Sequence, residues 1–146
     1  MEMKPNLIIF LVGGILVLAS LFMVYATSGL MADVNGWNLQ SYIRDYDDGI
    51  LAAVAEYFVF GLFIFSIFAI GEAIYYMFKP ENTKNALANM AFAGIANLIG
   101  AIIIIVEVGN LDFYNVGYGL YVAVAGAIII LVSAFLQYKE TGLKLN

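Results

Sequence analysis

Hydrophobic residues fill four long stretches of this chain, and polar residues gather in the short segments between them. The stretches cover residues 6–26, 50–78, 86–108 and 118–138. A hydrocarbon core about 30 Å thick is crossed by roughly 20 helical residues at a rise of ~1.5 Å per residue. Each stretch is about that long. The pattern therefore predicts an all-α, polytopic membrane protein: four transmembrane helices in an antiparallel bundle, forming a single domain over residues 1–146.

The basic residues predict how this bundle is oriented. Arg44 lies in the connecting segment 27–49, and the other five basic residues lie at the termini or in the segment 79–85: Lys4, Lys79, Lys84, Lys139 and Lys144. Short cytoplasmic loops collect Lys and Arg. We therefore expect both termini and the loop 79–85 to be cytoplasmic, and the loops 27–49 and 109–117 to lie outside. The expected location is the cell membrane.

The composition leaves few residues that carry chemistry. The chain has no histidine and no cysteine, so it lacks the usual ligands of zinc, haem iron and iron–sulfur clusters and the usual Ser–His and Cys–His nucleophiles. Only 12% of the residues are charged, against about 25% in soluble proteins. It also has no basic patch for nucleic acid. We expect no enzymatic activity, no catalytic residue, no metal site, no cofactor and no nucleic-acid partner.

The second stretch is bulky and aromatic on all sides. Its phenylalanines point in nearly all directions around a turn of 3.6 residues, and the loop before it adds three further aromatic residues, Trp37, Tyr42 and Tyr46. A helix that is bulky all round usually touches lipid, a partner subunit or both, and Trp and Tyr favour the membrane surface. We expect contacts with lipid or a partner from the following residues: Trp37, Tyr42, Phe60, Phe63, Phe65 and Phe68.

The third stretch is instead rich in alanine and glycine. At 100° per residue, five of its residues fall within about 40° of one line: Asn89, Ala93, Ala96, Gly100 and Glu107. Small residues let helix backbones approach closely in lipid. The fourth stretch offers a second row of small residues, Gly119, Ala123 and Ala127. We expect the third and fourth helices to pack tightly as a hairpin through these rows.

Polar residues inside the stretches are functional candidates, because such groups are costly in a membrane. Asn97 lies at the middle of the third stretch, where it can form an interhelical hydrogen bond or contact a ligand. Glu72 lies seven positions before Lys79, about 10 Å along the helix axis. Its carboxylate either reaches the inner interface or a hydrogen-bonding partner, or forms a proton or cation site on a conduction path.

Three functions therefore remain open. We favour a non-catalytic integral membrane subunit that packs with and supports partner subunits in a larger membrane protein complex. The alternative is a small oligomeric channel or proton/ion conduit, a homo-oligomer that uses Glu72 and Asn97. The third is a membrane enzyme that acts on lipid through Glu56, Glu107 and Asp112, although we expect Glu56 and Glu107 to be water-accessible positions at the outer rim.

Overall fold

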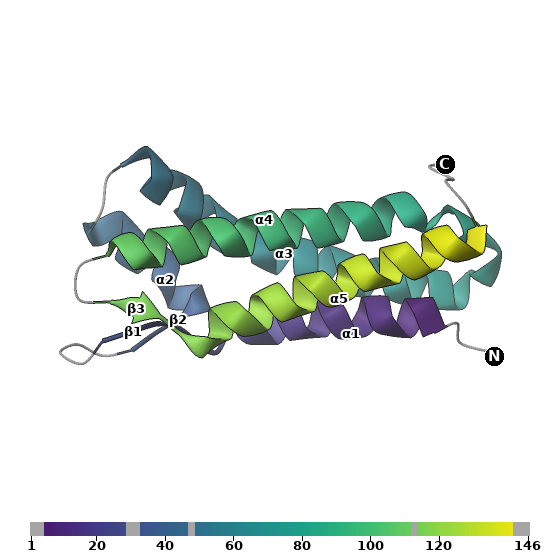
Figure 1. Cartoon of the computed structure of the whole chain (residues 1–146), viewed down its shortest axis with the longest axis horizontal. Helices are drawn as coiled ribbons and strands as arrows, with labels where there is room; N and C mark the ends of the chain where they lie inside the picture. Colours follow the sequence, from purple (N-terminus) through teal and green to yellow (C-terminus); the bar gives the residue numbers. More distant parts are fainter. Residues whose placement is uncertain (1–4, 29–32, 47–48, 112–113, 142–146) are drawn as a thin grey trace.

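Four long helices form the body of the protein in a computed structural model, which describes residues 5–28, 33–46, 49–111 and 114–141 (Figure 1). The long helices are α1 (Pro5–Ser20), α3 (Ile50–Phe78), α4 (Leu87–Asn110) and α5 (Tyr118–Thr141). The shorter elements lie between them: β1 (Val24–Thr27), β2 (Val34–Asn35), α2 (Gly36–Tyr46), the 3-10 helix η1 (Pro80–Asn85) and β3 (Asn115–Val116).

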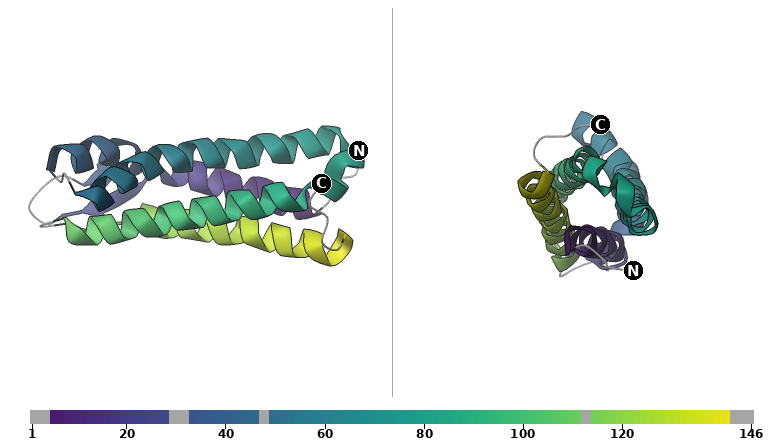
Figure 2. Two further views of the ribbon diagram at one scale, coloured as in Figure 1. Left: turned by 90° about the horizontal axis from the view of Figure 1, so that it is seen from above. Right: turned by 90° about the vertical axis from the view of Figure 1, so that its right-hand side faces the viewer.

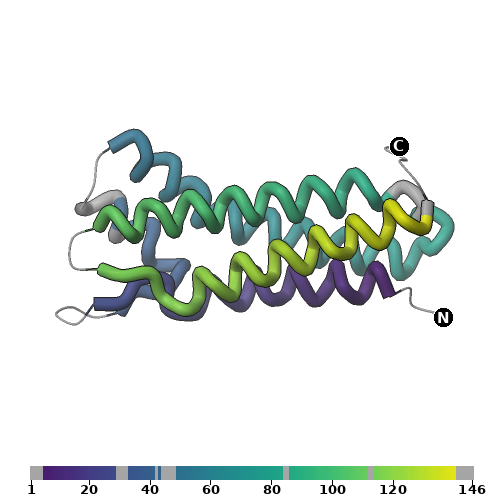
Figure 3. The backbone as a smooth tube through the Cα atoms, viewed as in Figure 1, coloured from purple at the N-terminus to yellow at the C-terminus, as the bar shows by residue number. Residues whose placement is uncertain are grey.

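The long helices form a closed, antiparallel ring. Each packs along two neighbours, in the order α1, α5, α4, α3 and back to α1, as the end-on view shows (Figure 2). The two chain ends and η1 lie at one end of the bundle, and the strands and α2 lie at the other (Figure 3). The predicted helix bundle is confirmed. Lys79 after α3 and Lys139 near the end of α5 lie at the same end of the bundle, and the orientation stays a prediction.

Three of the helices, α3, α4 and α5, are long and apolar enough to cross a membrane. The fourth differs from the expected span 6–26, because α1 ends at Ser20 after 16 residues. Ser20 Oγ donates a hydrogen bond to the Val17 carbonyl and lies 2.7 Å from the Tyr25 hydroxyl, and the chain then continues as β1. The last third of the first apolar stretch is therefore turn and strand.

The fold is mostly helical, as expected, but a small antiparallel sheet that the sequence analysis did not predict closes the end of the bundle opposite the start of α1. Its strand order is β2-β1-β3, and β1 pairs with β2 through Ala26–Val34 and with β3 through Ala26–Val116. The two expected loops 27–49 and 109–117 thus meet on one central strand. The Gly117 amide also donates to the Tyr25 carbonyl at 2.8 Å, which joins β1 to the start of α5.

Helices α1 and α5 approach closely at a pair of glycines. A Cβ atom on Gly126 would lie 2.8 Å from Val17 Cγ2 and 2.9 Å from the Gly13 carbonyl oxygen. A Cβ on Gly13 would in turn lie 2.8 Å from the Gly126 carbonyl oxygen. Because each glycine faces the backbone of the other helix, neither position has room for a side chain. This close crossing packs α1 directly against α5.

The small residues of α4 pack differently from the expectation. Helices α4 and α5 do pack together, but through Gly94, which faces Leu131. Gly100 faces α3 instead, where an added Cβ would lie 2.9 Å from Phe58 Cδ1. Gly119 of α5 packs against β1, where a Cβ would lie 2.8 Å from the Val24 carbonyl oxygen. The predicted hairpin of the two helices is confirmed, but Gly100 and Gly119 contact α3 and β1 and not each other.

The close contact of Gly13 with Gly126 predicts that a glycine-to-alanine change has opposite effects on the free energy of unfolding at Gly126 and at Gly71. We expect Gly126→Ala to reduce the free energy of unfolding by about 1–3 kcal/mol, because the methyl group has no room. Gly71→Ala is the matched control, since no atom lies within 4 Å of a Cβ there, and alanine in a helix interior is favoured by about 0.5–1 kcal/mol. Thermal unfolding in detergent, followed by circular dichroism, measures both. Equal midpoints for the two variants would contradict the crossing.

Candidate functional site

One amide side chain connects α3 and α4 near the end of the bundle that carries the termini. Asn89 Nδ2 donates to Glu72 Oε2 at 3.0 Å and to the Tyr76 hydroxyl at 2.9 Å. Glu72 and Tyr76 are four residues apart, so they lie on one face of α3. Glu72 and Asn89 are half-buried, and Tyr76 is buried. The structure thus brings together two of the predicted site residues, Glu72 and Asn89, and we call these three residues the amide bridge.

Asn97 lies apart from the amide bridge. It is fully buried, and its Nδ2 donates to the Ala93 carbonyl of its own helix at 2.8 Å, where we expected an interhelical bond or a ligand contact. Its Oδ1 is buried without a hydrogen-bond partner among the described residues. Because Asn97 is eight residues from Asn89, the two are separated by about 12 Å along α4. Glu72 and Asn97 therefore do not form one site.

Of the three acidic residues predicted for a lipid-directed enzyme, the two that the structure describes differ in burial. Glu107 is only 1% exposed, on the same face of α4 as the buried Ile104, so the expectation that water reaches this carboxyl is wrong. The Glu107 side chain is therefore buried within the bundle, where α4 packs against α3 and α5. Glu56 is half-buried on α3, and Asp112 lies outside the described residues.

The aromatic residues predicted to touch a partner also make contacts within the chain. Trp37 packs edge-on against Phe60 and Phe63, with ring centroids 5.8 and 5.2 Å apart, which holds α2 against α3. Phe65 and Phe68 pack edge-on against Phe92 of α4, at 5.5 and 5.8 Å. The Tyr42 side chain lies outside the described part of α2. Contact with a partner stays a prediction for these residues.

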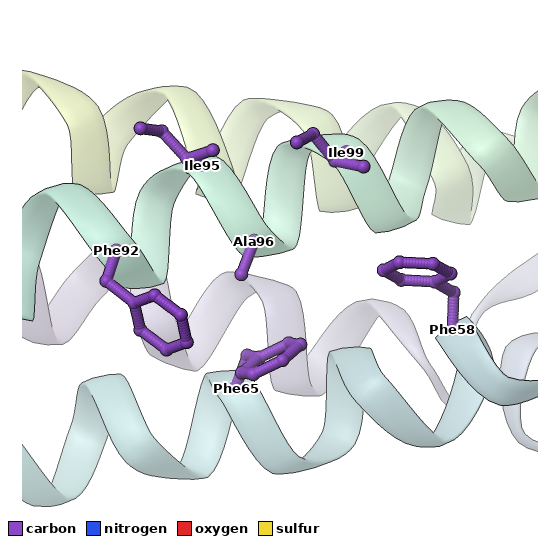
Figure 4. A pocket seen from close by; sticks show the side chains of 6 residues that line it. All are labelled: Phe58, Phe65, Phe92, Ile95, Ala96 and Ile99. Atoms are coloured by element: carbon purple, nitrogen blue, oxygen red, sulfur yellow. The ribbon is translucent and has the colours of Figure 1, made fainter.

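An apolar pocket of about 350 Å³ opens between α3 and α4. In Figure 4, Phe92 and Ala96 point from α4 toward α3, and Phe58 and Phe65 rise from α3 on the facing side. We call this the aromatic pocket, and its lining residues are Phe58, Phe65, Phe92, Ile95, Ala96 and Ile99. The large phenylalanine rings hold the two helices apart here, whereas Gly100 lets them approach one turn farther along α4.

A second polar network, which the sequence analysis missed, ties the ends of the chain together. Asn6 Nδ2 donates to Gln137 Oε1 at 3.2 Å and to Glu140 Oε2 at 2.9 Å, and Gln137 Nε2 donates to the Thr83 carbonyl at 2.7 Å. Gln137 is fully buried. The signal in the sequence was a single glutamine inside the last turns of an apolar stretch. This network fixes α1, η1 and α5 relative to one another.

The amide bridge can accept hydrogen bonds or a cation at one end of a helix pair whose middle carries the aromatic pocket. Glu72 supplies a carboxylate, and the Asn89 carbonyl and Tyr76 hydroxyl oxygens are further acceptors. No group of three or more Asp or Glu side chains that could hold a metal ion occurs within the described ranges. A scan against protein-family models, a search of curated proteins and a search of solved structures each found no match.

The amide bridge predicts coupled energies for its members. We expect Asn89→Ala to lower the free energy of unfolding by about 0.6–1.7 kcal/mol, the range measured for polar contacts between membrane helices. Tyr76→Phe should cost less, and its cost should be smaller in the Asn89→Ala background than alone, because both changes remove the bond between Asn89 and Tyr76. Thermal unfolding of the single and double variants in detergent measures this coupling.

The control for this cycle is Tyr75→Phe. It removes the hydroxyl that accepts a hydrogen bond from Asn82 Nδ2 at 2.9 Å, but that bond is exposed. We expect a smaller effect than for Tyr76→Phe, and the effect should add fully to that of Asn89→Ala. Additive costs for Asn89→Ala and Tyr76→Phe would show that the bridge does not act as one unit.

Proposed function

We propose that this chain is a non-catalytic integral membrane subunit that packs with and supports partner subunits in a larger complex of the cell membrane. The observation that carries the proposal is the distribution of its side chains. The polar residues near the termini bond to one another, while large apolar side chains remain outside. The following are more than half exposed: Phe22, Tyr57, Ile64, Phe78, Phe92, Tyr118, Tyr121 and Phe135. Such surfaces suit lipid and partner helices.

Four membrane crossings are supported by the way α1 is tied to α5. Asn6, near the start of α1, bonds to Gln137 and Glu140, and Tyr25, just beyond the end of α1, accepts the amide of Gly117. The segment from α1 through β1 therefore runs beside the full length of α5. Because α5 is long and apolar enough to cross a membrane, the segment from α1 through β1 would cross the membrane beside it.

The orientation in this proposal follows from the basic end of the bundle. Lys79 and Lys139 lie at the end with the termini, the end that also holds η1. Cytoplasmic loops collect Lys and Arg, so this end faces the cytoplasm. The sheet and α2 then face outward, and they offer partners the surface outside the membrane.

A conduit is the second candidate, and one observation favours it. Asn97 has a buried oxygen without a described partner near the middle of α4. An intramembrane polar group of this kind is a functional candidate. The chain between Asn97 and the amide bridge, however, carries the buried apolar residues Met90 and Ala93. We therefore rank the packing subunit first.

The first test is the composition of the native particle. We expect the tagged chain, extracted from its own membrane in mild detergent, to purify in a stoichiometric complex with larger chains, because its outer surface is apolar and bulky. Native mass spectrometry gives the mass and the subunits, and an unrelated four-span protein with the same tag is the control. A particle that contains only copies of this chain would overturn the subunit proposal.

Ion flux separates the two candidates directly. We expect purified wild-type protein in liposomes to give the same proton and cation flux as protein-free liposomes, and the Glu72→Gln and Asn97→Leu variants to match it. The measurement uses a pH-sensitive dye or a potential-sensitive dye under an imposed gradient. Wild-type flux that falls in both variants would support the conduit instead.

A further inference from the structure

The amide bridge and the aromatic pocket lie on the same lines of the same two helices. Glu72 follows Phe65 by seven residues on α3, and Asn89 precedes Ala96 by seven residues on α4. Seven residues are nearly two helical turns, so each polar residue is aligned with a pocket residue about 10 Å away along the axis. We call this strip of the α3–α4 interface, from the amide bridge to the aromatic pocket, the seam. The seam is polar toward the end of the bundle with the termini and apolar toward the middle.

The seam is continuous and faces outward. Between the amide bridge and the pocket, Phe68 and Phe65 both pack edge-on against Phe92. Aromatic contacts between α3 and α4 therefore extend from the pocket toward the amide bridge. Phe92, Ile95 and Ile99 are 53%, 50% and 46% exposed, so the pocket opens to the surroundings of the bundle. In the membrane placement proposed above, these surroundings are hydrocarbon.

We propose that this seam binds one phosphatidylethanolamine molecule, with an acyl chain in the aromatic pocket and its primary ammonium group at Glu72. The lining of the pocket is apolar and mid-span, which suits a hydrocarbon chain. The carboxylate requires a cation, because a charged group is costly in a low-dielectric environment unless it is paired. Among the described residues, the Asn89 amide and the Tyr76 hydroxyl bond to Glu72, and both of these groups are neutral.

The chemistry of the amide bridge favours a primary ammonium over a quaternary one. Glu72 Oε2 and the Tyr76 hydroxyl oxygen both lie within hydrogen-bond distance of Asn89 Nδ2. A primary ammonium has three N–H donors for the acceptor sites that these oxygens keep. A choline group carries the same charge without any N–H donor. Phosphatidylethanolamine and phosphatidylcholine with identical acyl chains therefore differ at the headgroup nitrogen. The first carries N–H donors, which we expect the amide bridge to recognise, and the second carries methyl groups.

A lipid chain fits the pocket better than a partner helix does. Close approach of helices in lipid depends on small residues, whereas the exposed rim here is formed by Phe92, Ile95 and Ile99. These large side chains keep a second helix backbone away, but a flexible acyl chain can pass between them. The proposal does not require a partner subunit, so it stands or falls separately from the complex proposed above.

The test measures lipid retention by the purified full chain. The protein in detergent is incubated with equal amounts of phosphatidylethanolamine and phosphatidylcholine of the same acyl composition, and native mass spectrometry counts the bound lipids. We expect a preference for phosphatidylethanolamine of about fivefold, the size that one net hydrogen bond supplies, since both headgroups carry the same charge. Glu72→Gln keeps the shape of the side chain and should bring the ratio to about one.

The pocket is tested by a matched pair of substitutions. Ala96→Phe fills the pocket and should lower the retention of both lipids about tenfold, since the buried acyl segment loses its contacts. Ala125→Phe makes the same change at an exposed position of α5 and should leave retention unchanged. A wild-type protein without preference, a Glu72→Gln variant with the full preference, or an Ala96→Phe variant with full retention would each overturn the proposal.

A photoactivatable acyl chain gives a second readout that needs no variant. Phosphatidylethanolamine with a diazirine in its acyl chain should label the peptides that contain residues 58–65 and 92–99, and peptide mass spectrometry locates the label. Labelling spread evenly over the exposed residues of all four helices would overturn the proposal. So would an Ala96→Phe variant that releases a co-purified subunit while retaining its lipid, because the pocket would then hold a partner helix.

Discussion

The close contact of α1 with α5 at Gly13 and Gly126 is the constraint on which the other interactions depend. Each glycine lies against the backbone of the opposite helix, so the crossing point and the register of the two helices are set by shape. Once this register is set, Asn6 meets Gln137 at one end and Tyr25 meets Gly117 at the other. In an environment without water, these bonds satisfy groups that would otherwise be costly to bury.

The four interfaces of the ring are not equivalent. At the α1–α5 interface the glycines bring backbones together, whereas at the α3–α4 interface Phe58, Phe65 and Phe92 hold the helices apart and leave the aromatic pocket. Helix association in lipid relies on packing and interhelical hydrogen bonds. The amide bridge of Glu72, Asn89 and Tyr76 supplies such bonds at one end of the looser interface. Polar contacts therefore supplement packing at both interfaces, through Asn6 at the α1–α5 interface and through the amide bridge at the α3–α4 interface.

The long helices could be predicted from the sequence because hydropathy reports the surroundings of a segment, and α3, α4 and α5 are surrounded by apolar groups along their length. Hydropathy cannot tell an apolar helix from an apolar strand, which is why β1 was hidden inside the first stretch. Periodicity showed that Asn89 and Gly100 share a face of α4, but not that this face meets α3. Glu72 and Asn89 were found as single candidates, whereas their pairing depends on how two helices are aligned in space.

The position of the amide bridge near one end of α3 and α4 explains why its polarity is tolerable. A half-buried carboxylate at the midplane would be costly, but Glu72 lies within two turns of the end of α3, where lipid headgroups and the Asn89 amide are within reach. The same seam becomes apolar two turns farther in, because Phe65 and Ala96 replace Glu72 and Asn89 on the same helix lines. A seam that changes from acceptor oxygens to aromatic rings over about 10 Å matches the polarity profile of one leaflet. The interface that contains the aromatic pocket is therefore the one whose chemistry best matches a lipid.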